Sequence, residues 1–189
     1  MAFPVLVRWL NCQTRHAWRV VLAFHSFIAK PFYIPSESMM PGLRTGDRLV
    51  VTKYPYGWSW VSPSFHIFPP TPGRVLGKLP ERGDIVIVTP PGTRTDYIKR
   101  VIGVPGDQVE INGGRVSVNG QELTEPYVPD EYRDRTSMER MTVPPGEYFV
   151  LGDHRSSSND SRTWGTVARH FIYGKAVFSY WPLDRLGWL

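Results

Sequence analysis

Apolar residues in the larger, C-terminal part of the chain fall into short runs. From residue 46 onward, runs rich in valine and isoleucine alternate with clusters of glycine, proline, aspartate and asparagine, a pattern typical of β-strands separated by turns. The sequence Asn112-Gly113-Gly114 is typical of a tight hairpin between two of these strands. We therefore predict a mostly β fold, an antiparallel sheet or barrel. The predicted strands span residues 48–54, 84–90, 96–104, 108–112, 115–120, 147–153 and 173–181.

Two longer segments break this pattern. Residues 121–146 are polar and carry charges of both signs, so we expect an inserted arm. Residues 58–68 contain Trp58, Trp60 and Phe65 and no acidic residue. Apolar side chains of this number are expected to be buried, either against the protein core or in lipid. We expect the segment to contact a membrane; the alternative is that it caps an open end of the barrel.

The N-terminal part contains one longer apolar run, residues 18–34. Arg19, His25 and Lys30 interrupt it, so its uncharged stretches are shorter than the roughly 20 residues that span a bilayer. We expect a retained membrane anchor or an interfacial helix within residues 1–34, followed by a β domain over residues 35–189. A buried soluble helix is the alternative. A cleaved signal peptide is disfavoured, because the run ends in Lys-Pro-Phe-Tyr and not in a small-x-small site.

The charge distribution favours a membrane over a nucleic acid as a partner. The formal net charge is +5, and the first 35 residues hold Arg8, Arg15, Arg19 and Lys30 with no acidic residue. Positive charge beside an apolar run suits a lipid surface or a topology signal, and there is no second basic block. We therefore expect membrane lipid, and no nucleic acid, among the partners.

The sequence suggests neither a disulfide nor a metal or cofactor site. Cys12 is the single cysteine, which excludes an intrachain disulfide and a cysteine metal cluster. The histidines lack the spacing of metal ligands; they are His16, His25, His66, His154 and His170.

Two segments combine a candidate nucleophile with a candidate base. Ser38 lies between Pro35 and Pro41, and Lys99 lies in the middle of a predicted strand. Strand alternation puts Lys99 and Arg100 on opposite faces, so one of them faces the core if either face is buried. Burial would lower the pKa of the lysine, as a general base requires. Taken alone, each segment also fits a Pro-bounded turn or a surface lysine on an edge strand.

With a third segment, these pieces resemble the type I signal peptidases, the Ser-Lys endopeptidases of the secretory pathway. The resemblance covers four blocks in the family's order, which makes coincidence improbable. They are PSESMMPGL (35–43), GDRLVVTKYPYG (46–57), RGDIVIV with DYIKRVIGVPGD (82–107) and LGDHRSSSNDSRTWG (151–165). His154 and Ser156 depart from the family, which more often has Asn and Asp there.

The resemblance implies a role for each matching residue. Ser38 matches the nucleophile and Lys99 the general base, while Ser36 and the Ser38 backbone N–H match the oxyanion hole. The residues that match the base-orienting and supporting groups are Ser158, Asp160 and Arg162. The residues that match the substrate pockets are Phe32, Ile34, Met39, Leu43, Asp96, Tyr97 and Ile98.

The resemblance also implies a function and a location. It implies a membrane-bound serine endopeptidase that removes signal peptides from exported preproteins after small residues, with its catalytic domain on the extracytoplasmic side of the cell membrane. A soluble self-cleaving repressor-type protease is disfavoured, because only about 35 residues precede the serine, too few for a DNA-binding domain. A membrane-tethered β-barrel binding module without catalysis, or an inactive homologue, remains as an alternative; a large distance between Ser38 and Lys99 would favour the former.

Overall fold

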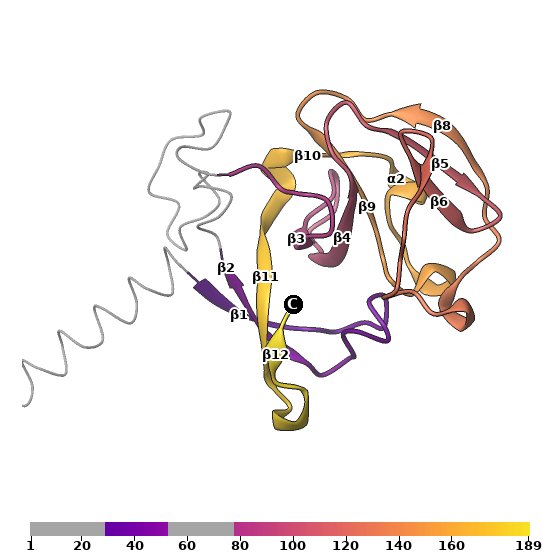
Figure 1. Cartoon of the computed structure of the whole chain (residues 1–189). Helices are drawn as coiled ribbons and strands as arrows, with labels where there is room; N and C mark the ends of the chain where they lie inside the picture. The colour runs from indigo at the N-terminus through magenta and orange to yellow at the C-terminus, as the bar shows by residue number, and fades with distance from the viewer. Residues whose placement is uncertain (1–28, 53–77) are drawn as a thin grey trace, which may run out of the picture.

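The computed structural model describes residues 29–52 and 78–189. Its described strands form two antiparallel sheets (Figure 1). The larger sheet has the strand order β1-β2-β11-β3-β4-β9-β10, with β12 paired to β11. Its strands are β1 (Ala29–Tyr33), β2 (Arg48–Thr52), β3 (Ile85–Val88), β4 (Tyr97–Gly103), β9 (Glu147–Leu151), β10 (Val167–Ala168), β11 (Ile172–Trp181) and β12 (Gly187–Trp188).

The smaller sheet has the order β7-β6-β5-β8. Its strands are β5 (Gln108–Asn112), β6 (Arg115–Val118), β7 (Gln121–Glu122) and β8 (Met138–Thr142). Short helical turns lie between the strands; they are η2 (Asp130–Tyr132), η3 (Arg155–Ser157), α2 (Ser161–Trp164), η4 (Arg169–Phe171) and η5 (Leu183–Arg185).

The mostly β, antiparallel fold is confirmed. The predicted strand 108–112 forms β5 with the predicted bounds, and each of the other predicted strands overlaps an observed one. The hairpin is also present: Asn112 pairs with Arg115, which leaves Gly113 and Gly114 as a two-residue turn with φ of 55° and 83°. Positive φ at both positions is the requirement of a type I′ hairpin turn, which glycine meets without steric cost.

The helix predicted over residues 18–34 is wrong at its C-terminal end. Ala29–Tyr33 form β1, which pairs only with β2 in the described sheet. Pro31 lacks an N–H group and suits an edge strand of this kind. Residues 18–28 and 58–68 lie outside the described residues. In the described part of the chain, no helix combines the length and the apolar character that crossing a bilayer requires.

The polar segment 121–146 contains two strands that the sequence pattern did not predict. Strand β7 has only two residues. Strand β8 joins β5 with a register shift between the Val109 and Ile111 pairs. As a result Met138 and Met141, three positions apart, both pack against the core. An irregular register of this kind erases the period of two that identifies a strand in sequence.

Two strands carry apolar side chains on both faces and so join three core clusters. In β3, Ile85 and Ile87 enter one cluster while Val86 and Val88 enter a second. In β9, Tyr148 and Val150 belong to the second cluster, whereas Phe149 and Leu151 belong to a third, beneath the smaller sheet. Alternation along a strand thus lets single strands serve two cores, which explains their nearly unbroken apolar sequences.

The hairpin glycines provide a stability test with an internal control. A Cβ at Gly114 would lie 2.0 Å from the backbone oxygen of Asp134, whereas a Cβ at Gly113 meets nothing within 4 Å. We expect Gly113→Ala to lower the free energy of unfolding by about 1–2 kcal/mol, the ordinary cost of a left-handed alanine. Gly114→Ala should cost clearly more, because the 134–136 backbone must move. Urea denaturation of both variants measures the difference, and equal losses would contradict the close packing.

Candidate active site

The two residues expected to be the nucleophile and the base are in direct contact. Ser38 lies in the turn that follows β1, and Lys99 lies in the middle of β4. The Lys99 Nζ atom donates a hydrogen bond of 2.8 Å to Ser38 Oγ. Ser38 is 7% exposed and Lys99 only 1%. Sixty-one positions of sequence therefore separate two side chains that the fold brings together in a desolvated site.

Burial of the Lys99 ammonium group has an electrostatic consequence. Desolvation lowers the pKa of Lys99 from 10.5 to about 8, because the charged form loses its hydration. The negative charges of Asp160 and Asp153 act in the opposite direction and raise this pKa, and Arg162 lowers it. The effect of burial prevails, so at pH 7 about a tenth of the amine is unprotonated and able to accept a proton.

The loop that follows β9 packs directly on the backbone of Ser38. The His154 backbone N–H donates to the Ser38 carbonyl oxygen at 3.1 Å. A Cβ at Gly152 would lie 2.5 Å from that same oxygen and 2.2 Å from Ser158 Oγ. Position 152 therefore has no room for a side chain, and the loop holds the backbone of Ser38 in place.

Asp160 and Arg162 form the ion pair expected from the sequence. Arg162 Nη2 lies 2.8 Å from Asp160 Oδ2, and its Nε donates to Oδ1 at 2.9 Å. Asp160 is fully buried and also accepts from the Gly152 backbone N–H at 3.1 Å. Burial alone would raise the pKa of Asp160, but the bonds and the charge of Arg162 outweigh it and hold this pKa below its ordinary value.

Ser158, expected to orient the lysine amine, makes no such bond in this structure. Its Oγ is buried and has no well-aligned hydrogen-bond partner among the described residues. It lies close enough to the Asp160 carboxylate to help lower the pKa of that group. The role of Ser158 toward Lys99 stays a prediction.

Three acidic residues near this loop were not singled out from the sequence. Asp153 binds Arg100, with Oδ2 2.6 Å from Nη2. Arg100, the charged neighbour of Lys99 on the opposite face of β4, therefore has a carboxylate partner. Glu125 pairs with Arg155, and Asp134 pairs with Arg162. Glu125 and Asp134 come from the polar segment 121–146, where neither spacing nor neighbouring sequence distinguishes them from solvated charges.

Ser36, the expected oxyanion-hole donor, is exposed, and its Oγ lies 3.3 Å from Ser38 Oγ. It is therefore next to the hydroxyl of the expected nucleophile. Among the described residues, no group of histidine, cysteine and carboxylate side chains has an arrangement suited to a metal ion.

The residues expected to form substrate pockets fall into separate environments. Ile34, Met39, Leu43 and Ile98 are at most 2% exposed and belong to one core cluster. The Tyr97 ring packs on the second cluster, with its centroid 5.6 Å from Lys99 Nζ.

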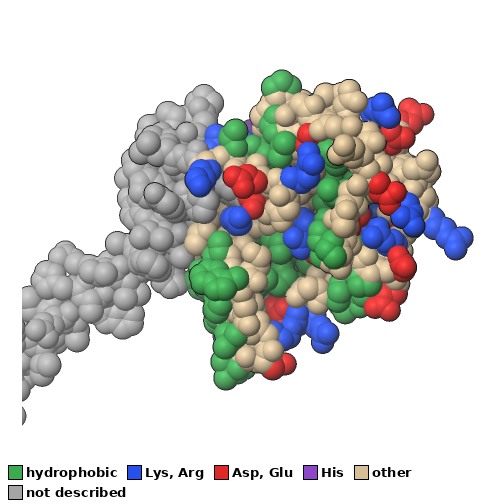
Figure 2. All heavy atoms as spheres, viewed as in Figure 1, with side chains coloured by type: hydrophobic (Ala, Val, Ile, Leu, Met, Phe, Trp, Pro, Cys, Tyr) green, Lys and Arg blue, Asp and Glu red, His purple; other side chains and the backbone are tan. Residues whose placement is uncertain are grey.

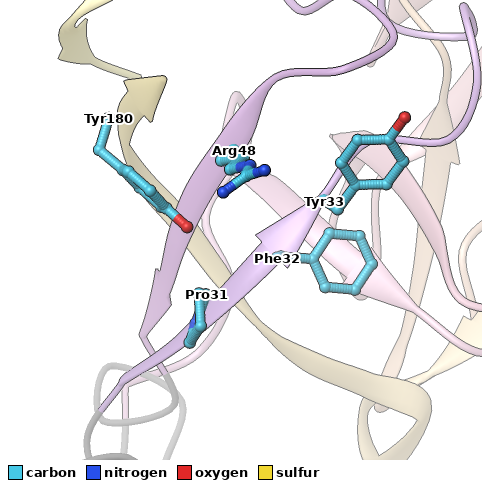
Figure 3. A pocket seen from close by; sticks show the side chains of 5 residues that line it. All are labelled: Pro31, Phe32, Tyr33, Arg48 and Tyr180. Carbon is cyan, nitrogen blue, oxygen red and sulfur yellow. The ribbon is translucent and has the colours of Figure 1, made fainter. Parts of the chain in front are cut away.

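The remaining two expected pocket residues lie nearer the surface. Asp96 is exposed and accepts a hydrogen bond of 2.6 Å from Thr89 Oγ1. Phe32 packs partly against the core cluster and also lines a hollow of about 360 Å³ beside β1 and β2 (Figure 3). The hollow is lined by Pro31, Phe32, Tyr33, Arg48 and Tyr180.

A buried serine bonded to a lysine of lowered pKa is an arrangement suited to nucleophilic catalysis without histidine. Residues 7–181 match the family model described as signal peptidase, peptidase S26. The chain therefore belongs to this family. Like its relatives, it is a serine endopeptidase that removes signal peptides from preproteins.

Several curated proteins are similar over most of the chain. A signal peptidase I of Leptolyngbya laminosa is 40% identical over 89% of this chain and 76% of its own length. A probable signal peptidase I-1 of Synechocystis is 38% identical over 90% of this chain and 80% of its own length. A crystal structure of a signal peptidase I from Enterococcus faecalis is 35% identical, covers 52% of this chain and 97% of its own, and has a TM-score of 0.45.

The lowered pKa of Lys99 gives the folded protein a specific dependence on pH. Between pH 8 and 10.5 the unfolded lysine keeps its proton while the folded one has lost it, so stability rises with pH across this interval. Replacing Lys99 with methionine removes the effect. The difference in unfolding free energy between Lys99→Met and the unaltered protein should therefore change by about 3 kcal/mol from neutral to strongly alkaline pH. The stability of the variant relative to the unaltered protein should be highest at neutral pH, where the buried lysine is charged.

Urea denaturation of both proteins across this pH range measures that difference, and other titrating groups cancel because both proteins contain them. A difference that stays constant with pH would mean that Lys99 keeps an ordinary pKa.

Proposed function

We propose that Ser38 attacks the peptide bond that joins a signal peptide to its preprotein, and that Lys99 serves as its general base. The observation that carries this proposal is the buried hydrogen bond of 2.8 Å between Lys99 Nζ and Ser38 Oγ. In the reaction the neutral amine accepts the Ser38 proton as Oγ bonds to the carbonyl carbon. The resulting ammonium then gives that proton to the leaving amine, and water hydrolyses the acyl-enzyme by the same route.

The pKa of Lys99 makes this proton transfer feasible near neutral pH. With a pKa of about 8, about a tenth of the amine is neutral at pH 7, compared with far less than a hundredth for an ordinary lysine. The proton acceptor is thus available without histidine or carboxylate participation. Arginine cannot replace it, since a guanidinium stays protonated at any working pH.

The oxyanion of the tetrahedral intermediate needs donors fixed in advance. We assign this role to the Ser36 hydroxyl and the Ser38 backbone N–H, which is supported by the 3.3 Å separation of the two serine hydroxyls. Asp160, Arg162 and Ser158 are assigned to positioning the loop beside Lys99. The bonds from Asp160 to both Arg162 and the Gly152 backbone support this assignment.

Substitution of the dyad tests the mechanism. We expect Ser38→Ala and Lys99→Ala each to abolish cleavage of a signal-peptide-bearing preprotein while leaving the fold intact, and Lys99→Arg to remain inactive. In the unaltered enzyme, kcat/KM should rise with pH through an apparent pKa near 8, as the amine loses its proton. Cleavage assays from about pH 6 to 10 with each variant measure this. Activity retained in Lys99→Ala would eliminate the lysine as the base.

The side chains assigned to the substrate pockets are large and apolar, which favours small substrate residues. Ile34, Met39, Leu43 and Ile98 already fill one core cluster, and a close-packed core leaves little room for a further large side chain. We also assign Phe32, Asp96 and Tyr97 to these pockets, with Tyr97 supported by its proximity to Lys99 Nζ.

Subsite selectivity follows from this crowding. A preprotein with alanine at the positions one and three before the cleaved bond should be processed, whereas leucine or phenylalanine at either position should lower kcat/KM by at least about a hundredfold, because a larger side chain clashes with the pocket walls. Matched preproteins that differ at one position measure each subsite separately. Equal rates for alanine and leucine would show that other residues select the substrate.

Membrane lipid is the second partner that we propose, with the catalytic domain on the extracytoplasmic side of the cell membrane. Figure 2 shows hydrophobic side chains on the lower part of the described surface, over the end of β11 and the η5–β12 region. Trp181, Leu183, Leu186 and Trp188 are 49–83% exposed there. Such a patch is unusual on a protein surrounded by water, and tryptophan favours the headgroup region.

A further inference from the structure

The polar segment 121–146, which includes β7 and β8, supplies carboxylates to the loop that packs against Ser38. We propose that Glu125 and Asp134 are positioning residues of the active site, each of which fixes one arginine of the loop 152–162. The inference rests on the proposed function of Ser38 and Lys99. It assigns to the segment a part in catalysis beyond that of a surface arm.

Glu125 is the more deeply buried of the two carboxylates. Its side chain is 1% exposed and that of its partner Arg155 is 2% exposed. Arg155 directs both terminal nitrogens at this carboxylate, while Arg133 contributes a further bond of 3.3 Å to Oε2. A guanidinium that is this buried needs a carboxylate to stay in place, so Glu125 determines the position of Arg155.

Arg155 passes this constraint to the nucleophile through two backbone groups. Its Nε donates to the Gly152 carbonyl oxygen at 3.0 Å. Gly152 in turn lies against the Ser38 carbonyl oxygen. The backbone N–H of His154, two residues further along the loop, donates to the same oxygen at 3.1 Å. A displaced Arg155 therefore shifts the surface on which the Ser38 backbone rests.

Asp134 acts on the other end of the same loop. Its carboxylate pairs with Arg162 Nη1, and Arg162 uses its remaining nitrogens for Asp160 and for the Arg155 carbonyl oxygen, the latter at 2.8 Å. Asp160 then holds the Gly152 N–H. The two carboxylates of the segment thus reach the same glycine, one through its carbonyl oxygen and one through its N–H.

The segment also contains a matched control. Glu122 forms an ion pair with Arg115 at 2.6 Å, but both side chains are more than half exposed and neither touches the loop. Glu122→Gln therefore removes a carboxylate of the same segment without affecting the chain of contacts that ends at Ser38.

The test compares the full-length Glu125→Gln, Asp134→Asn and Glu122→Gln variants in cleavage of a preprotein, with kcat expressed per folded molecule and measured well below each unfolding midpoint. We expect Glu125→Gln to lower kcat by about ten- to a hundredfold, the usual effect of a small misplacement of a reacting group. KM should change by less than about twofold, since neither carboxylate contacts the substrate pockets. Asp134→Asn should have a smaller effect in the same direction, because its side chain is 18% exposed, and Glu122→Gln should have none.

A double-mutant cycle separates positioning from general loss of stability. In an Arg155→Gln background, Glu125→Gln should change kcat by less than about twofold, because the group through which it acts is already missing. Additive effects of the two substitutions would overturn the proposed route. Should Glu125→Gln fail to fold, Asp134→Asn and its cycle with Arg162→Gln provide the same test.

The remaining outcomes distinguish this inference from the proposed function. If Glu125→Gln and Asp134→Asn lose stability but keep the kcat of the unaltered enzyme per folded molecule, while Ser38→Ala is inactive, the segment is only structural and the dyad stands. If Ser38→Ala cleaves at the normal rate, the proposed function fails, and this inference fails with it.

Discussion

The site depends on the burial of the Lys99 ammonium group, whose removal from water is unfavourable in free energy. Strand β4 places this side chain beneath Ser38, where desolvation lowers its pKa to about 8 and the amine bonds to the serine hydroxyl at 2.8 Å. The same burial that penalises folding near neutral pH supplies the proton acceptor of the proposed mechanism. Asp160 and Asp153 reduce the penalty through their charges but do not bond to the amine, so its lone pair stays available when the proton has left.

The surroundings of Lys99 show how the fold tolerates such a group. Its neighbour Arg100 points to the opposite face of β4, where Asp153 binds it with two hydrogen bonds and the Tyr127 ring lies 4.0 Å from its guanidinium carbon. Charged groups around the dyad are therefore paired with one another and not with the lysine. Because these pairs are buried or half-buried, each holds backbone in place as well as neutralising charge.

Much of this architecture can be predicted from the sequence, for identifiable physical reasons. The unbroken apolar run of β3 and the paired glycines of the β5–β6 hairpin are local signals, and local signals survive without tertiary context. The contact between Ser38 and Lys99 was expected from ordered motifs and from the conflict between Lys99 and Arg100 on one strand. Strand β8 was missed because its register shift removes the alternation, and β1 was taken for helix because its apolar residues continue an apolar run. Glu125 and Asp134 could not be distinguished, since a carboxylate in a polar segment has the same local pattern whether it is solvated or buried against an arginine.

The order of the segments along the chain determines when the proposed active site can assemble. The proposed nucleophile Ser38 follows β1, whereas its proposed base lies on β4 and the loop that packs on Ser38 extends to Arg162, beyond β9. During synthesis from the N-terminus, Ser38 emerges long before the groups that surround it, and an isolated serine is a weak nucleophile. On the proposed mechanism, the growing chain is thus inactive for most of its synthesis. The proposed dyad forms only when these distant segments have closed on one another, so a truncated chain that lacks the 152–162 loop is left without the support of the Ser38 backbone.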